Sequence, residues 1–122
     1  MTLIEAIRAL LVSAGIEAFI VDAPEEKLSA GAVVLLPYGG ETDETLPLST
    51  VHFQVRASAA TFTASEALCW RAFQALEDAA PDGADRQVIG RIAARQEPFF
   101  LGKEGELYIH EFNAQVAACW KE

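Results

Sequence analysis

Basic residues are scarce in this chain of 122 residues. Its 9 lysines and arginines stand against 18 aspartates and glutamates, which gives a net charge of -9. Proteins that bind nucleic acid neutralise phosphates with clustered Lys and Arg, so this balance argues against nucleic acid and against anionic membrane surfaces. Long apolar runs are also missing, although a helix that spans a membrane needs about 20 apolar residues. We therefore expect neither a nucleic-acid nor a membrane partner.

Cysteine is nearly as rare, with two residues in the chain. Cys69 and Cys119 lie inside apolar runs, which is typical of buried, reduced thiols, and their spacing requires no disulfide. Glu5 and Arg8 interrupt the apolar stretch near the N-terminus, so this stretch does not match a signal peptide. We expect an intracellular protein with two free cysteines.

Residue patterns typical of catalytic or metal sites are absent as well. His52 and His110 are both predicted to lie within strands, whereas functional residues concentrate on loops, and no HExxH spacing supports a metal site. No serine lies in a GxSxG turn, and Cys69 on an apolar helix face is expected to stay protonated. Gly39 and Gly40 follow a strand without the GK[ST] of a phosphate loop. We expect no enzyme activity, no metal and no cofactor.

What the chain does have is enough apolar residues for one folded domain. Hydrophobic residues make up 52% of the sequence, and a chain of this length buries roughly two-thirds of its unfolded surface without disulfides or metals. No repeat, low-complexity tract or long linker divides the chain. We expect a single domain that spans residues 1–122.

Hydrophobic periodicity predicts two helices and five strands. The helices cover residues 2–14 and 63–80, and each begins with a capping box, which the second helix forms from Thr63 and Glu66. The predicted strands cover residues 16–21, 32–37, 49–57, 88–95 and 107–120. The order is helix, three strands, helix, two strands. It predicts an α+β fold with an antiparallel or mixed sheet of four to five strands and two helices packed on one face.

An acidic stretch, PYGGETDET at residues 37–45, is longer than a simple connection between two strands needs. We expect a loop that Gly39 and Gly40 hinge and that stays mobile until a neighbour binds it. A solvated loop, an interaction loop and, least favoured, an ion site all remain open for its acids. The candidate contact residues here are Tyr38, Gly39, Gly40, Glu41, Asp43 and Glu44.

Two further features favour contacts with a partner. On the predicted strand 49–57, Gln54 and Arg56 alternate with apolar residues and therefore face away from the core. Phe99 and Phe100 lie in a predicted turn before the last strand, and exposed aromatic rings are typical of interface hot spots. We include these four residues among the candidate contacts.

Two long stretches carry motifs of a known kind. The first is LLPYGGETDETLPLSTVHFQVRA, which leads into the predicted helical segment ASEALCWRAFQALE. The second is QEPFFLGKEGELYIHEFNAQV, in which a P-x-x-L-G-x-(D/E) turn precedes a strand with an F-N pair. The residues that match this second pattern are Pro98, Leu101, Gly102, Glu104, Phe112 and Asn113. Together the two stretches resemble the small minor capsid and tail-completion proteins of long-tailed bacteriophages.

The resemblance covers nearly the whole chain and implies a structural role in the virion. It implies a tail terminator, a ring that is expected to be a hexamer, which caps the tail tube and joins it to the head. The implied partners are other copies of the chain, the tail tube protein and a head-completion (connector) protein. The implied place is the head-tail junction, after assembly in the host cytoplasm. In such a ring, we hypothesise that Arg56 of one subunit meets an acid in residues 41–44 of the next.

The residues alone leave another function open, a small intracellular ligand-binding or regulatory α+β domain. Such a domain would hold a ligand between helices and sheet, and it needs polar groups that converge on an apolar pocket. The sequence points to no such set. A hydrolase that uses Glu and His is a weaker third alternative, because neither histidine has a recognisable partner to orient it. The oligomeric state separates the ring from the ligand-binding domain.

Overall fold

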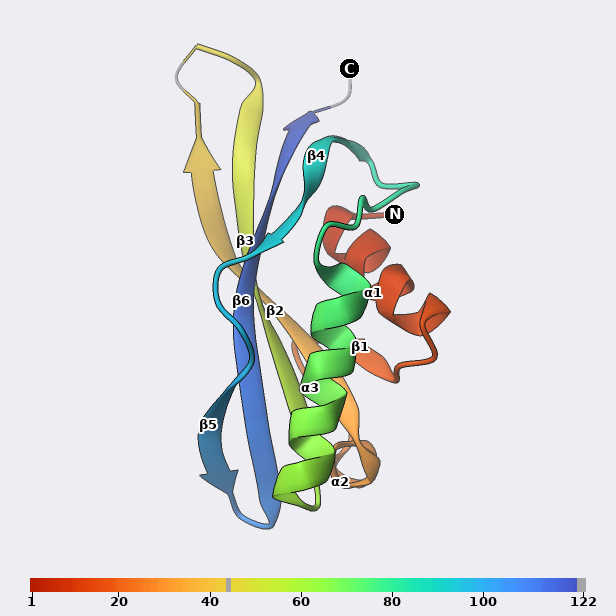
Figure 1. The fold of residues 1–122 in the computed structure, drawn as a ribbon. Helices are drawn as coiled ribbons and strands as arrows, with labels where there is room; N and C mark the ends of the chain where they lie inside the picture. Colours follow the sequence, from red (N-terminus) through yellow and green to blue (C-terminus); the bar gives the residue numbers. More distant parts are fainter. Residues whose placement is uncertain (44, 121–122) are drawn as a thin grey trace.

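The computed structural model describes residues 1–43 and 45–120 (Figure 1). The described residues form an α+β domain with three helices and six strands, one helix and one strand more than the upper limit predicted from the sequence. The elements are α1 (Leu3–Ser13), β1 (Ala18–Ile20), α2 (Glu25–Ala30), β2 (Ala32–Thr42), β3 (Leu48–Ala59), α3 (Phe62–Leu76), β4 (Arg86–Ala94), β5 (Phe99–Glu104) and β6 (Leu107–Trp120).

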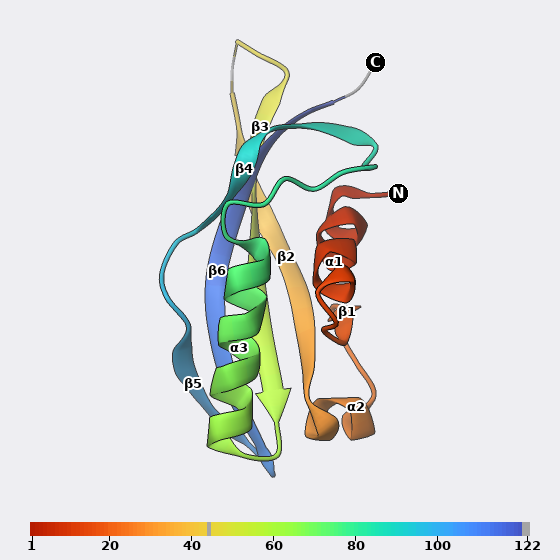
Figure 2. The same ribbon diagram turned by 45° about the vertical axis from the view of Figure 1, so that its right-hand side comes forward.

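The strands form one mixed sheet in the order β1-β2-β3-β6-β4, as the sequence allows. β1 and β2 are parallel, and every other pair is antiparallel. β5 pairs with the first half of β6, on the edge where β4 pairs with the second half. The predicted packing of two helices on one face is confirmed, because α1 and α3 lie side by side on the same side of the sheet (Figure 2). We call this the helix side, and the opposite side the open face.

The core lies between the two long helices and the sheet. Phe53 on β3 and Phe112 on β6 are fully buried on the helix side, where alternate residues of each strand point. Ile7 and Leu11 of α1 are four residues apart and meet them from the helix layer. Burial of each such side chain stabilises the fold by roughly 1.5–3 kcal/mol.

The first helix begins at the predicted capping box. The Thr2 hydroxyl accepts a hydrogen bond from the Glu5 N–H (3.3 Å), and the Glu5 carboxylate accepts one from the Thr2 N–H (2.8 Å). The bonds from the Thr2 backbone and hydroxyl hold the pKa of the exposed Glu5 carboxyl below its usual value. Reciprocal capping of this kind satisfies two N–H groups that the first helical turn leaves unpaired.

The predicted helix at residues 63–80 begins one residue later and ends four residues later than α3. Its N-cap is Thr61, whose hydroxyl accepts from the Ala64 N–H (3.1 Å), and Thr63 forms no capping box. Glu66 is therefore free to face the sheet. The helix ends at Leu76 instead of residue 80, because the chain turns there through a positive φ at Asp78.

Two elements lie where the sequence indicated irregular structure. α2 occupies part of a predicted loop, and none of its residues is buried, so it has no apolar periodicity by which to recognise it. β5 occupies a predicted turn, and only Gly105 and Glu106 form the turn between β5 and β6. Pairing with β6 creates β5, and a register shift between Phe100 and Gly102 interrupts its pattern.

The predicted loop at residues 37–45 is wrong as far as Thr42, because β2 continues to that residue and pairs with β3. The two glycines serve the strand pairing. Gly39 has a φ of 111° beside a register shift, and a Cβ atom on Gly40 would overlap the carbonyl oxygen of Thr50. Figure 1 shows that this β2–β3 hairpin reaches beyond the ends of both long helices.

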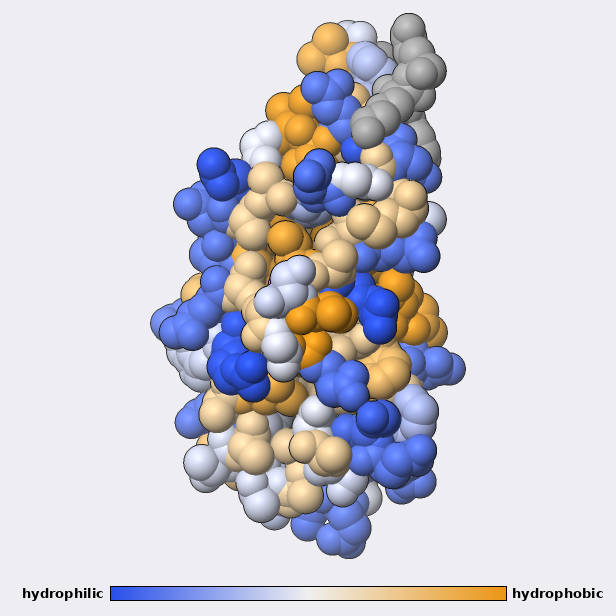
Figure 3. Space-filling model, turned by 90° about the vertical axis from the view of Figure 1, so that its right-hand side faces the viewer, coloured by the Kyte–Doolittle hydropathy of each residue, from blue (hydrophilic) through white to orange (hydrophobic). Residues whose placement is uncertain are grey.

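Apolar and hydrophilic residues are interspersed on the surface of the helix side (Figure 3). Hydrophilic residues line both margins, and the apolar residues between them form small separate groups. Large apolar side chains are also exposed on the hairpin, on β4 and in β5.

Candidate functional site

The predicted contact residues fall into three regions of the molecule. Glu44 lies outside the described residues. The others are Tyr38, Gly39, Gly40, Glu41 and Asp43 on the β2–β3 hairpin, Gln54 and Arg56 on the open face of β3, and Phe99 and Phe100 in β5.

Asp43 organises the end of the hairpin. Its carboxylate accepts hydrogen bonds from the backbone N–H of Thr45 (2.8 Å), the Thr45 hydroxyl (2.9 Å) and the N–H of Leu46 (3.0 Å). These bonds, the one from the Thr45 backbone foremost, hold the pKa of the Asp43 carboxyl below its usual value. Within residues 1–43 and 45–120, no group of three potential metal ligands comes together. The acid therefore fixes the turn, as Asp does in many tight turns.

His52 fastens the hairpin to the segment after β4 on the open face. Its Nδ1 lies 3.4 Å from Nη1 of Arg95, and its Nε2 lies 3.7 Å from the carboxylate of Glu41. Arginine can only donate, so Nδ1 accepts and the imidazole proton sits on Nε2, facing Glu41. The Tyr38 ring packs beside it, with ring centroids 5.8 Å apart. Four side chains from three segments thus hold the base of the hairpin.

Arg56 is engaged within its own chain. Its Nη2 and Nε lie 3.2 and 3.3 Å from one carboxylate oxygen of Glu111, its register partner on β6. Glu111 is 5% exposed, and a buried carboxylate without a cation is costly. The Arg56 side chain remains partly exposed, so its hypothesised contact with a neighbouring subunit stays a prediction.

A hollow of about 190 Å³ opens on the same face, beside Arg56. Pockets for small organic ligands usually span ~300–1,000 Å³ and carry several converging polar groups. Here the lining is mostly apolar, and Arg56 is its one basic residue among the described ones. The hollow gives little support to the ligand-binding alternative.

Phe99 and Phe100 lie on opposite sides of the sheet, because they are neighbours in a strand. Phe99 is the register partner of Glu111 on the open face, and Phe100 is the partner of His110 on the helix side. Both rings are exposed, Phe99 by 38% and Phe100 by 46%. The Phe100 ring contacts Phe62 and His110, at centroid distances of 5.1 and 5.3 Å. The two rings therefore cannot form one contact surface, because each faces a different side of the sheet.

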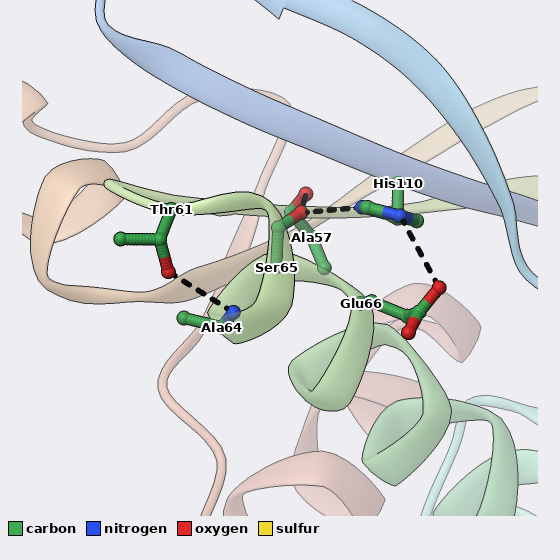
Figure 4. Close-up of polar contacts among 6 residues, drawn as sticks. All are labelled: Ala57, Thr61, Ala64, Ser65, Glu66 and His110. Carbon is green, nitrogen blue, oxygen red and sulfur yellow. Dashed lines mark hydrogen bonds and ion pairs between the residues drawn. The ribbon is translucent and has the colours of Figure 1, made fainter.

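The most suggestive polar group joins α3 to β6 (Figure 4). Ser65 Oγ lies 2.9 Å from Nδ1 of His110, and Glu66 Oε2 lies 4.0 Å from Nε2 of the same ring. These are the residue types of a hydrolase triad. Their geometry is different, since the Ser65 hydroxyl donates to the carbonyl of Ala57 (3.1 Å), and Nδ1 must therefore donate to Ser65. The fully buried Ser65 therefore links α3 to β3 and β6, and its hydroxyl is not arranged as a nucleophile.

Burial controls the chemistry of two further groups on the helix side. It lowers the pKa of His110 from its usual value, against a smaller opposite effect of the Glu66 carboxylate. It also raises the pKa of the Cys69 thiol to about 12, with an added contribution from Glu111. Cys69 is a buried, protonated thiol as predicted. Cys119 is also free but only half-buried.

Sequence patterns did not single out four residues that the structure places at these sites. Glu111 is the partner of the predicted contact residue Arg56, and Arg95 is the partner of His52, for which the sequence predicted no contact role. Strand register and tertiary packing bring these pairs together. Phe62 directly follows the N-cap Thr61, and it was missed because the predicted helix started at residue 63. Glu66 was assigned to a capping box instead. The missed residues are Phe62, Glu66, Arg95 and Glu111.

Comparisons with known proteins identify a family and a similar fold. The model of a family described as bacteriophage tail terminator protein matches residues 4–120. A chain of the virion of a native gene transfer agent (GTA) particle has a similar fold, with a TM-score of 0.69 and 15% identity, over 97% of this chain and 92% of that one. No curated protein matches the chain significantly. Among the described residues, no helix is long and apolar enough to cross a membrane.

Proposed function

Because the chain belongs to the bacteriophage tail terminator family, it is a structural protein of the virion tail, and we propose that it forms a closed ring that caps the tail tube. The proposed ring is a hexamer with the tail tube protein on one side and a head-completion protein on the other. The observation that carries this proposal is the family match, which runs from residue 4 to residue 120. We propose no catalytic activity, which agrees with the bonding of Ser65.

The β2–β3 hairpin is the proposed contact with a neighbouring subunit. It projects beyond the helices, Asp43 fixes its turn, and His52 holds its base. An element that is already ordered loses less conformational entropy on association, which favours binding. In a closed ring, each subunit presents one surface to the previous copy and a different surface to the next. The hairpin supplies one of these surfaces.

The exposed charge of Arg56 is the proposed counterpart of the hairpin acids. Replacing Arg56 alone would leave the buried Glu111 without its cation, so a loss of assembly could reflect misfolding. The double variant Arg56→Glu with Glu111→Arg avoids this, because it keeps an ion pair inside the chain and reverses the exposed charge. We expect it to fold and to assemble more weakly than the wild type.

The mass of the assembled protein, measured by light scattering, tests the ring directly. We expect one defined oligomer for the wild type, alone or after addition of tail tubes. Glu41→Arg on the hairpin should weaken it, because Glu41 is strongly exposed and its contact with His52 is long. Glu25→Arg on α2 is the matched control, since it makes the same charge change far from the hairpin. A wild-type chain that stays monomeric even with tubes would overturn the proposal.

A further inference from the structure

Three aromatic rings and one carboxylate meet where α3 begins, and their residues are Phe62, Glu66, Phe100 and His110, which we call the aromatic corner. The rings touch in every pairing, with centroids 4.7–5.3 Å apart. Phe62 is 42% and Phe100 is 46% exposed, although both cover a buried histidine. Large aromatic side chains are usually more deeply buried than Phe62 and Phe100 are, and a buried polar group beneath them is uncommon.

The histidine at the base of the corner has one nitrogen without a partner. His110 is 2% exposed, and its Nδ1 donates to Ser65. Its Nε2 therefore carries a lone pair, and none of the described residues provides it with a hydrogen bond. A buried polar atom of this kind is costly and rare in native structures. Figure 4 shows that Nε2 points toward Glu66.

Glu66 adds a second acceptor that faces the same point. Its carboxylate oxygen lies 4.0 Å from Nε2, and its side chain is 52% exposed. An ionised carboxylate and an unprotonated imidazole nitrogen both accept hydrogen bonds, and neither can donate to the other. The pair therefore lacks a donor that could reach both atoms at once.

Nε2 has an accessible surface below 1 Å², so a donor reaches it only when the half-exposed side chains above it move aside. The donor that suits the two acceptors is a side chain with a positive charge and several N–H groups. A Lys ammonium or an Arg guanidinium can donate to both acceptors and compensate the Glu66 charge. The faces of Phe62 and Phe100 attract cations as well. An anion would be repelled by Glu66, and the described residues offer no third ligand for a metal ion.

We propose that the aromatic corner receives a Lys or Arg side chain from a partner protein other than a copy of this chain. The net charge of -9 favours basic partner surfaces. Most of the chain's own basic side chains already contact groups within the chain. These are Arg8, Lys27, Arg86, Arg91, Arg95 and Lys103, and Arg56 is already the proposed counterpart of the hairpin acids.

The site is tested on the isolated protein, at a constant pH of about 7.5 where a histidine is mostly neutral. Protein with ¹⁵N-labelled histidine is titrated with arginine amide, and the imidazole and phenylalanine ring signals are followed by NMR. We expect saturable shifts at His110, Phe62 and Phe100 with a dissociation constant on the order of millimolar, since only one side chain binds. His52 is the internal control and should not shift.

Two controls isolate the charge contacts. Citrulline amide has nearly the shape of arginine without its charge, and we expect it to bind at least about tenfold more weakly. Glu66→Gln should weaken arginine binding about fivefold or more, whereas Glu26→Gln on the exposed α2 should leave it unchanged.

Equal shifts with citrulline, unchanged binding in Glu66→Gln, or no shift at His110 would each overturn the proposal. Shifts of the same signals that depend on protein concentration without arginine would assign the corner to a second copy, and would also overturn it. Because the test uses no tail component, a failure of the proposed ring does not affect its outcome.

Discussion

His52 and His110 lie on adjacent strands of one sheet and are almost equally buried, yet their surroundings are opposite. His52 faces the open side between the cation of Arg95 and the acid of Glu41, and its proton sits on Nε2. His110 faces the helix side, and its proton sits on Nδ1, because Ser65 accepts there. The partners of each ring, and not its burial, place the proton.

The comparison also separates two structural roles. His110 links β6 to the start of α3 and lies under two aromatic rings, so it belongs to the core that stabilises the whole domain. His52 links the base of the projecting hairpin to the segment after β4. We therefore expect changes at His110 to affect global stability, and changes at His52 to affect mainly the hairpin.

The largest effect is expected from His110→Ala. It removes a buried ring, opens a cavity beneath Phe62 and Phe100, and leaves Ser65 without its donor. We expect the free energy of unfolding in urea to fall by about 2–4 kcal/mol. His52→Ala, the matched change on the open face, should cost less than about 1.5 kcal/mol. Equal losses for the two variants would contradict the distinction between core and hairpin.

A smaller loss is expected from Ser65→Ala, which removes the link and leaves the ring in place. Nδ1 of His110 and the carbonyl of Ala57 both lose their partner, so we expect a loss of about 1–2 kcal/mol by urea unfolding. Thr63→Ala is the control, because Thr63 lies exposed in the same helical turn and makes no cap. It should change stability by less than about 0.5 kcal/mol.

The pH dependence of stability should reflect the burial of His110. Burial lowers the pKa of His110, so between that value and the ordinary 6.5 the unfolded chain binds more protons than the folded one. Its contribution to stability is complete above about pH 6.5 and is lost as the pH falls. His110→Gln should flatten the slope of unfolding free energy between pH 7 and 5. An unchanged slope in His110→Gln would disprove this assignment.

The smallest expected effect is local. Arg95→Ala removes the donor to Nδ1 of His52, and it should speed hydrogen exchange of the hairpin amides at residues 39–42 by about fivefold to tenfold, with global stability nearly unchanged. Arg71→Ala, an exposed arginine on α3, serves as the control. Faster exchange throughout the sheet would show that the hairpin and the body open together.

The architecture was predictable because it rests on periodic burial. Alternation predicted correctly that Gln54 and Arg56 of β3 face away from the core, and helical spacing predicted α1 to within one residue at each end. Elements that depend on distant partners were missed. β5 is a strand because β6 pairs with it, and β2 extends through Gly40 because that glycine lets Thr50 approach closely. Local patterns do not contain these pairings.

The candidate site was predictable only in part, for the same reason. Arg56 and the two phenylalanines were recognised as outward or exposed residues, but their partners follow from register. Glu111 meets Arg56 across 55 positions of sequence, and Ser65 meets His110 across 45. Such contacts require the fold to be known first.

Electron microscopy of purified protein mixed with tail tubes of the same phage can show the proposed ring itself. We expect ring-shaped density of this chain at one end of the tubes, with the β2–β3 hairpin at the contact between neighbouring subunits. Bare tube ends at saturating protein concentration, with the chain remaining monomeric in solution, would contradict it.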